Sequence, residues 1–394
     1  MMRNLNLLAS IQALPRDLRL LFLSLFLWTF GLGVYNYVWS IYLRNLGALP
    51  EQVGLVYSVG FPAAAASMIP GGLLANKYEL RTLIIISWAM SLPPPVMFYH
   101  ARVWPDVIPG LLILQVSGFS LPAFNAYIST ASDQGKMASS FGAVYAAAPL
   151  GIVISPAMGS ILLNWLQIRD LFWVSFAFFS VSTLVLFRVG RQPPLETDKS
   201  HPLIELPKSS LEKTILILLA GDTIAYSITA SFLPLYFQDI YHLTNVQIQL
   251  LGAVQSLGGA VLAILLGRWA TRRNPGGAMA AGFLLVSGGV AGIALTASPF
   301  LVLPMVFFFG TARAPSLVSY SILSGLKKGG SRGGRFGLYL TLEQLGFVIG
   351  SSVGGFLYAM GPVSVLGVTS VSFLALAGLS LLRIEKLVPP QKQT

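Results

Sequence analysis

"GGLLANKYELR", residues 71–81, is a short polar break between two apolar stretches. The stretch before it, VYSVGFPAAAASMIP (56–70), and the stretch after it, TLIIISWAMSLPPPVMF (82–98), contain no charged residue. An apolar segment of about twenty residues is long enough to cross the hydrocarbon core of a bilayer as a helix. The pattern therefore predicts a loop that joins two transmembrane helices at one face of a membrane.

The composition extends this pattern to the whole chain. Of the 394 residues, 55% are hydrophobic and only 10% are charged, whereas about a quarter of the residues of a soluble protein are charged. Backbone groups in lipid must be paired within the protein, and the apolar stretches lack the alternation of barrel strands, so we expect helices. The sequence predicts an all-α membrane protein with twelve transmembrane helices, near residues 18–43, 52–75, 82–100, 107–131, 141–164, 170–188, 214–237, 247–267, 277–297, 299–326, 336–359 and 363–383.

The net charge of +11 comes from basic residues that gather on one predicted side of the membrane. When the twelve spans alternate in direction, nearly all of the 25 Lys and Arg residues fall on the side that holds both termini. Cytoplasmic loops carry such an excess of Lys and Arg. We therefore expect an integral inner-membrane protein with both termini in the cytoplasm, and the basic charge calls for no nucleic-acid partner.

The polar loop at residues 71–81 has a counterpart in the second half of the chain, LGRWATRRNPG at residues 266–276. Gly72 and Lys77 align with Gly267 and Arg272, and the same offset aligns spans 2 to 5 with spans 8 to 11. The chain is thus interpreted as two six-helix bundles, residues 1–188 and 214–394, joined by a polar cytoplasmic linker at residues 189–213. Parallel repeats of this kind form one large architecture of secondary transporters.

With these features the sequence resembles the major facilitator superfamily over nearly its whole length. The loop motif of that family is Gly-x-Leu-Ala-Asp-Arg-x-Gly-Arg-Lys, and it is matched here by Gly72, Leu74, Ala75, Lys77 and Arg81. Asn76 stands in place of the acid of the motif, and Glu79 stands in place of its second glycine. The resemblance implies two helical bundles that expose a central cavity to each side of the membrane in turn.

The loop motif has two interpretations. Basic residues at a cytoplasmic helix end are explained by topology alone. The resemblance instead implies a gating latch that joins the two halves by charge pairs, at Gly72, Asn76, Lys77, Glu79, Arg81, Gly267 and Arg272. Because Asn76 cannot form an ion pair, such a latch is expected to be weaker or wired differently, and Glu79 is a candidate substitute acid.

Small residues recur at every fourth position in spans 5 and 11. The family's antiporter motif, Gly-x-x-x-Gly-Pro-x-x-Gly-Gly, resembles residues 151–160 at Gly151, Pro156 and Gly159, and span 11 repeats the spacing at Gly346, Gly350 and Gly354. Such stripes allow a neighbouring helix to approach closely. They are consistent with static helix packing and with a sliding surface between the halves.

Ionisable residues inside a span are functional candidates, because burying a charge in lipid costs at least a few kcal/mol. The sequence places Asp222 in span 7, Arg313 in span 10 and Glu343 in span 11. One interpretation is that an acid pairs with Arg313 and only stabilises the fold. The other is that Asp222 or Glu343 carries a proton, and that movement of Arg313 changes its proton affinity.

By resemblance to the family, spans 1, 4, 7 and 10 line the central cavity. Candidate lining residues on these spans are Trp28, Tyr35, Asn36, Gln115, Asn125, Tyr226, Arg313 and Tyr320. Aromatic rings together with acids suit lipophilic, often cationic, compounds. Arg313 instead suits a carboxylate or a phosphate.

The sequence thus predicts a secondary active transporter that works by alternating access, and not an enzyme. The first hypothesis is proton-coupled export of small amphipathic or drug-like molecules. The alternatives are proton-coupled uptake or exchange of a small organic anion, and a non-transporting membrane receptor or scaffold. We expect a monomer in the lipid bilayer, with a small-molecule substrate and the proton as its coupling ion, without cofactor or metal.

Overall fold

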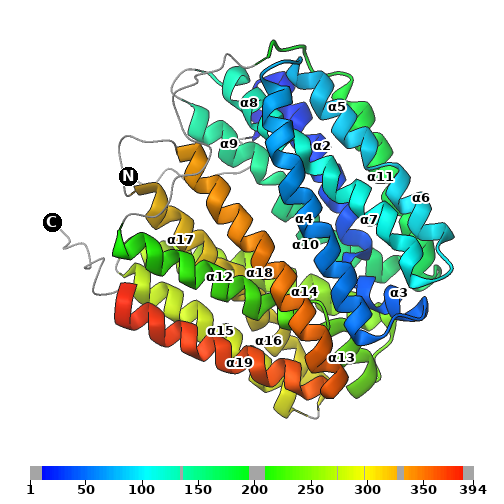
Figure 1. Ribbon diagram of the computed structural model, residues 1–394, viewed down its shortest axis with the longest axis vertical. Helices are drawn as coiled ribbons and strands as arrows, with labels where there is room; N and C mark the ends of the chain where they lie inside the picture. The colour runs from blue at the N-terminus through cyan, green and yellow to red at the C-terminus, as the bar shows by residue number, and fades with distance from the viewer. Residues whose placement is uncertain are drawn as a thin grey trace. The chain divides into compact units, whose positions relative to one another are not determined.

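The computed structural model describes residues 11–133, 136–194, 209–272, 274–296, 298–325 and 332–384, which form α-helices joined by short turns (Figure 1). Within these ranges, 11 helical segments are long and apolar enough to cross a membrane: Arg16–Asn36, Pro50–Ala75, Leu80–His100, Trp104–Ala131, Ser139–Leu162, Ile168–Leu186, Ser210–Ile240, Asn245–Ala270, Pro275–Leu295, Pro299–Ser319 and Pro362–Ile384. The remaining predicted span, 336–359, corresponds to helix α18 (Arg332–Met360). The predicted all-α membrane fold is therefore confirmed.

Several of the predicted spans are interrupted helices. Spans 3, 4, 7 and 10 each contain a second helix that begins with a proline within its first two residues. Proline lacks the N–H that would continue the hydrogen-bond ladder, so the helix breaks and restarts there. These four spans are α5 (Leu80–Met90) with α6 (Pro93–His100), α7 (Val107–Val116) with the 3₁₀ turn η2 (Ser117–Ser120) and α8 (Leu121–Ala131), α12 (Ser210–Ala230) with α13 (Leu233–Ile240), and α16 (Pro299–Phe309) with the 3₁₀ turn η4 (Gly310–Arg313) and α17 (Ala314–Gly325). Span 1 is divided without a proline, into α2 (Arg16–Asn36) and α3 (Trp39–Asn45).

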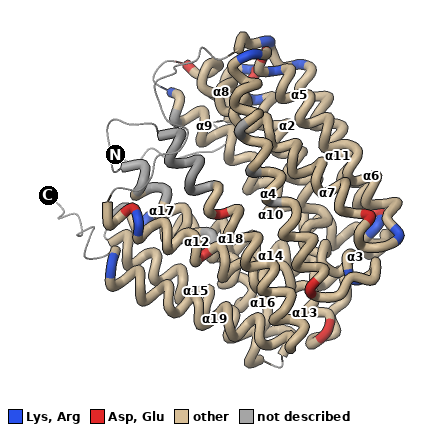
Figure 2. The backbone as a smooth tube through the Cα atoms, in the orientation of Figure 1, with Lys and Arg blue, Asp and Glu red and all other residues tan. Residues whose placement is uncertain are grey.

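The other long helices run without such a division. They are α4 (Pro50–Ala75), α10 (Ala147–Leu162) after the short α9 (Met137–Tyr145), α11 (Leu171–Leu186), α14 (Asn245–Arg272), α15 (Pro275–Leu295), α18 and α19 (Pro362–Leu379). In the described part of the chain, most Lys and Arg residues lie at helix ends rather than in the middle of helices (Figure 2).

The helices form two compact units. Unit 1 consists of residues 1–47 and 63–197, and unit 2 consists of residues 48–62 and 198–394. The first turns of α4 belong to unit 2 because they pack on α18, where the Ser58 hydroxyl donates to the Val348 carbonyl at 3.0 Å and shares a hydrogen bond of 2.7 Å with Ser352. Helix α4 thus has its first residues in unit 2 and its later residues in unit 1.

Each unit is built around its first helix. In unit 1, α2 packs on α10 and α11, and in unit 2, α12 packs on α18 and α19. The two glycine stripes lie at these contacts: a Cβ at Gly151 would lie 2.9 Å from the Phe30 amide nitrogen on α2, and a Cβ at Gly354 would lie 2.6 Å from the Ile228 carbonyl oxygen on α12. Each of these contacts joins two helices of the same unit. Static helix packing, one of the two interpretations of the stripes, accounts for them.

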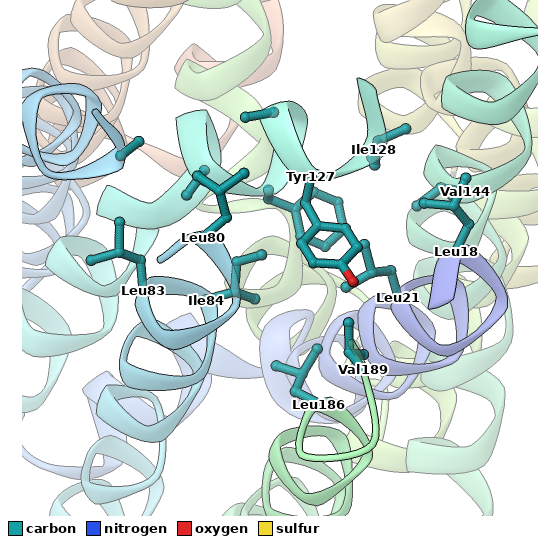
Figure 3. Packing of buried hydrophobic residues seen from close by; sticks show 14 of the residues in the cluster. Leu18, Leu21, Leu80, Leu83, Ile84, Tyr127, Ile128, Val144, Leu186 and Val189 are labelled. Carbon is teal, nitrogen blue, oxygen red and sulfur yellow. The ribbon is translucent and has the colours of Figure 1, made fainter. Parts of the chain in front are cut away.

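A hydrophobic cluster closes one end of unit 1 (Figure 3). It gathers side chains from the start of α2, the start of α5, α8 and the end of α11, among them Leu18, Leu21, Leu80, Leu83, Ile84, Phe124, Tyr127, Leu186 and Val189. Val189 lies beyond the last residue of α11 and is only 3% exposed. The cluster therefore includes the first part of the chain that leads toward unit 2.

Gly71, rather than the motif glycine Gly72, is the position where the loop region needs a glycine. A Cβ at Gly71 would overlap the carbonyl oxygen of Phe119 in η2, whereas a Cβ at Gly72 would meet nothing within 4 Å. Gly267, the counterpart of Gly72, is equally open. The close contact between α4 and η2 is thus made by the residue that precedes the part of the sequence resembling the family motif.

We predict that Gly71→Ala destabilises the protein by about 1–3 kcal/mol, because the added methyl group forces the α4 and η2 backbones apart. Gly72→Ala should be neutral or stabilising by about 0.5–1 kcal/mol, since alanine favours a helix interior. Thermal unfolding of the purified protein in detergent measures both changes. Equal midpoints for the two variants would contradict the assignment.

Candidate functional site

Asp222 is a buried carboxylate in the middle of a transmembrane helix of unit 2. Helix α12 begins at a capping box, in which the Ser209 hydroxyl accepts from the Glu212 amide and the Glu212 carboxylate accepts from the Ser209 amide, both at 3.1 Å. The helix then carries Asp222 into an apolar segment, where the residue is only 3% exposed. A carboxylate in such a place must be hydrogen-bonded.

Ser316 on α17 supplies a donor to this carboxylate. Its hydroxyl donates to Asp222 Oδ2 at 2.6 Å, and Ser316 itself is buried. A short hydrogen bond from a hydroxyl to a carboxylate is stronger than one between neutral groups. The break at η4 and the proline Pro315 come directly before Ser316, so the interruption of span 10 sets the direction in which α17 presents its hydroxyl.

Tyr226 lies one turn after Asp222 on the same face of α12. Its ring stacks on Phe309 at the end of α16, with centroids 5.4 Å apart, and meets the edge of Phe347 on α18 at 6.3 Å. Gln255 on α14 donates from Nε2 to the Tyr226 hydroxyl at 3.3 Å. Four elements of unit 2 thus converge around Asp222 and Tyr226, and the sequence did not single out Gln255, although it is a polar residue in an apolar span.

The other predicted charged residues of unit 2 are less fully described. Glu343 on α18 is half-buried. Asp222 accepts a hydrogen bond from Ser316. The side chains of Arg313, Tyr320 and Arg272 lie outside the described part of the structure. The hypothesis that Arg313 pairs with an acid therefore stays a prediction.

Two of the predicted cavity residues of unit 1, Trp28 and Tyr35, lie among aromatic side chains. The Trp28 indole donates to the Ser91 hydroxyl at 3.1 Å and stacks on Phe179 at 5.5 Å. Tyr35 is 3% exposed and lies among aromatic rings, 5.0 Å from the ring of Phe172. These two side chains are therefore placed as packing residues inside unit 1.

The polar candidates of unit 1 are more accessible. Asn36 is exposed at the last residue of α2, and Gln115 is half-buried near the end of α7. Asn125 on α8 accepts a hydrogen bond from the hydroxyl of Tyr145 on α9. The assignment of Asn36, Gln115 and Asn125 to a substrate cavity stays a prediction.

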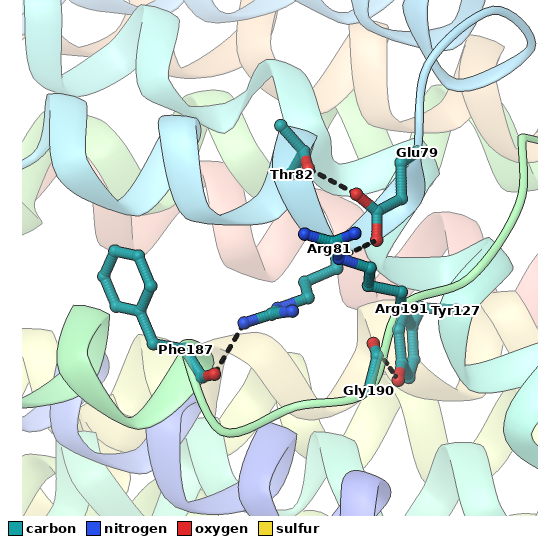
Figure 4. A network of polar contacts seen from close by, with 7 residues as sticks. All are labelled: Glu79, Arg81, Thr82, Tyr127, Phe187, Gly190 and Arg191. Carbon is teal, nitrogen blue, oxygen red and sulfur yellow. Dashed lines mark hydrogen bonds and ion pairs between the residues drawn. The ribbon is translucent and has the colours of Figure 1, made fainter.

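The loop motif makes its described contacts within unit 1 (Figure 4). Glu79 precedes α5, accepts from the Thr82 hydroxyl at 2.7 Å and pairs with Arg191 at 3.8 Å. Arg81 donates from Nη2 to the Phe187 carbonyl oxygen at 2.6 Å. Asn76 is half-buried, and the exposed Lys77 lies with its Nζ 5.6 Å from the centre of the Tyr78 ring.

These features together define a polytopic helical membrane protein with a buried carboxylate in one of its two units. The sequence matches the family description "Major Facilitator Superfamily" over residues 21–324 and 215–394. The chain belongs to the Major Facilitator Superfamily; it is an integral inner-membrane transporter and not an enzyme.

Known proteins of similar sequence are exporters. The enterobactin exporter EntS of Shigella flexneri is 25% identical over 98% of this chain and 97% of its own length, and that of Citrobacter koseri is 25% identical over 98% and 96%. Solved structures confirm the fold. The nucleoside transporter NupG has a TM-score of 0.71 at 16% identity, covering 96% of this chain and 97% of its own, and a bacterial homologue of the human lysosomal transporter Spinster has 0.70 at 15%, covering 93% and 94%.

We predict that Ser316→Ala destabilises the protein by about 1–3 kcal/mol, because the buried Asp222 carboxylate loses a donor. Ser319→Ala is the matched control: Ser319 is also buried on α17, but its hydroxyl donates at 3.0 Å to the Pro315 carbonyl of its own helix. Thermal unfolding of the two variants compares them directly. A Ser316→Ala midpoint that equals that of Ser319→Ala would show that the contact to Asp222 contributes nothing to stability.

Proposed function

We propose that this transporter exports small amphipathic organic molecules and couples their export to the entry of protons. Two observations support the proposal: the similar proteins are named as exporters, and Asp222 is buried in a transmembrane helix. An ionisable side chain in that position is costly, so its presence indicates a function in binding or coupling. The hydrogen bond between Ser316 and Asp222 is the observation that carries the proposal.

A hydroxyl group is a suitable partner for a carboxyl group that binds and releases a proton. The Ser316 hydroxyl donates to the ionised carboxylate, and after rotation it can accept from the protonated acid. Asp222 therefore keeps a hydrogen bond in both protonation states. A proton can be taken up at one side of the membrane and released at the other without leaving the carboxyl group unpaired.

The aromatic side chains beside Asp222 indicate the kind of substrate. Tyr226 and Phe347 are half-buried aromatic residues, the buried Phe309 stacks on Tyr226, and Gln255 and the carboxylate add polar atoms, all within unit 2. Lipophilic molecules with a positive or hydrogen-bond-donating group suit such surroundings. We further propose that both termini are cytoplasmic, that the transporter acts as a monomer, and that the two units open the path to each side of the membrane in turn.

The second candidate function is proton-coupled uptake or exchange of a small organic anion. It rests on Arg313, the last residue of the 3₁₀ turn η4, which α17 follows. An arginine at a break in a transmembrane helix suits a carboxylate or a phosphate. Thermal stabilisation by organic anions that disappears in Arg313→Ala would favour this function over export.

We predict that everted membrane vesicles with an acidic interior accumulate ethidium, a lipophilic aromatic cation, when they contain the wild-type protein. Asp222→Asn should lower this gradient-driven rate at least about tenfold, a rise in the barrier of about 1.4 kcal/mol, because asparagine cannot carry a proton. The variant should keep ethidium exchange without a gradient, since it retains the shape of the site.

The matched control is Asp239→Asn, which removes another carboxylate that accepts from a hydroxyl, that of Tyr358 at 2.7 Å, but at the end of α13. Its gradient-driven rate should stay near that of the wild type. Full gradient-driven accumulation by Asp222→Asn would exclude Asp222 as the proton carrier. Accumulation of fluorescein by right-side-out vesicles in acidic medium, with no ethidium transport in either preparation, would favour the anion alternative.

A further inference from the structure

The segment that follows α11 is fixed to unit 1 instead of leaving it at the helix end. Val189 inserts into the hydrophobic cluster between Leu186 and Tyr127 and is only 3% exposed (Figure 3). Removing a valine side chain from water stabilises such an attachment. Val189 therefore attaches this segment to unit 1 by apolar contact, in addition to the polar contacts described next.

Tyr127, Asp17 and Gly190 meet next to this apolar anchor. The Tyr127 hydroxyl lies 2.8 Å from the Gly190 carbonyl oxygen (Figure 4). It also lies 2.9 Å from Asp17 Oδ2, so one donor serves two acceptors. A Cβ at residue 190 would come within 2.6 Å of the same carboxylate oxygen. Glycine at this position thus lets the chain pass between the start of α2 and the end of α8.

The loop before α5 and the segment after α11 satisfy each other's unpaired backbone groups. The first amides of a helix and its last carbonyls have no partner inside the helix. The Leu80 amide, at the first residue of α5, donates to the Gln192 carbonyl oxygen at 3.2 Å. In the other direction Arg81 donates to the carbonyl oxygen of Phe187, the residue that caps α11, where a positive charge is also favoured by the helix dipole.

Two further contacts lie at the edge of this arrangement. The Thr130 hydroxyl donates to Gln192 Oε1, and Arg191 pairs with Glu79 at 3.8 Å. The Arg191 side chain is 82% exposed, and ion pairs between exposed groups contribute little. The attachment should therefore depend on Val189, Tyr127 and Arg81 much more than on the charge pair.

We propose that Arg81, Tyr127 and Asp17 are positioning residues that lock residues 187–192 to unit 1, in an arrangement we call the linker clamp. The connection to unit 2 then begins at Pro193 and not at the end of α11. The clamp stays closed throughout the transport cycle. Residues 187–192 then move together with unit 1, and any movement of unit 1 is transmitted to the chain from Pro193 onward. This consequence for transport rests on the alternating movement proposed above, whereas the clamp itself rests on contacts within unit 1.

The first test measures whether the clamp is closed, using trypsin and the arginines inside it. Arg188 and Arg191 have exposed side chains, but the backbone carbonyls of the preceding residues, Phe187 and Gly190, are hydrogen-bonded to unit 1. In purified protein, Tyr127→Phe and Arg81→Gln should each raise the rate of cleavage after Arg188 at least about tenfold, which corresponds to about 1.4 kcal/mol of opening free energy. The controls Tyr78→Phe and Lys77→Gln remove a tyrosine hydroxyl and a positive charge outside the clamp, in the loop before α5, and should leave the rate unchanged.

The second test measures whether the clamp must open for transport. The chain contains no cysteine, so Glu79→Cys with Arg191→Cys gives one reactive pair without background. A short bis-methanethiosulfonate crosslinker should join this pair, protect the bond after Arg188 and leave the ethidium transport rate near that of the uncrosslinked variant. When Tyr127→Phe is added, maximal rate should fall with the half-saturating concentration unchanged, and crosslinking should restore the rate.

Two outcomes would overturn the proposal. Equal cleavage after Arg188 in the wild type and in Tyr127→Phe and Arg81→Gln would show that these residues do not hold the segment. Loss of transport on crosslinking, recovered by a reducing agent, would show that residues 187–192 must leave unit 1 during the cycle. The cleavage test needs no transport, so it stands even where the wild type moves no ethidium and the proposed function fails.

Discussion

Every backbone N–H and C=O group of this protein that lies in the hydrocarbon layer must find its partner inside the protein, and the rest of the structure depends on this constraint. It explains why the apolar segments are helices. It also requires that the backbone groups freed where proline interrupts a helix find other partners inside the protein. Both interrupted spans that contain a 3₁₀ turn pack closely against glycine: η2 lies against Gly71, and η4 lies against Gly259, whose Cβ would be 2.8 Å from the Gly310 carbonyl oxygen. The breaks are thus stabilised by close contact between backbones, which only a residue without a side chain permits.

The same constraint separates polar side chains that hold the fold together from those that can do chemistry. The indoles of Trp28 and Trp88 donate to the hydroxyls of Ser91 and Ser182, and these bonds join neighbouring helices without any change of charge. Asp222 differs, because its carboxyl group can gain or lose a proton while Ser316 stays its partner. Neutral pairs therefore account for packing inside a unit, and the ionisable pair is the one on which the proposed proton coupling rests.

The sequence was sufficient to predict the fold class and the place of the spans, because length and hydropathy act along the chain and need no knowledge of its neighbours. It also identified Asp222 from the cost of a buried charge. It could not show that Ser316 binds Asp222, that Trp28 and Tyr35 pack inside unit 1, or that Gly71 rather than Gly72 meets a neighbouring backbone. Each of these depends on the rotation of one helix against another, and a helix with nearly uniform apolar composition carries no periodic signal of that rotation.

The loop motif shows how a departure from a family pattern can be compensated by new local contacts. Asn76 removes the charge that a latch between the halves would use, yet Glu79 and Arg81, only a few residues further on, are both bound to the chain after α11. Their partners are a carbonyl at a helix end and an exposed arginine, and neither needs the missing acid. The first amide of α5 is satisfied by the same segment. In this chain Arg81 thus has a structural reason beyond topology: it satisfies a carbonyl at the end of α11, while the segment that follows α11 satisfies the first amide of α5.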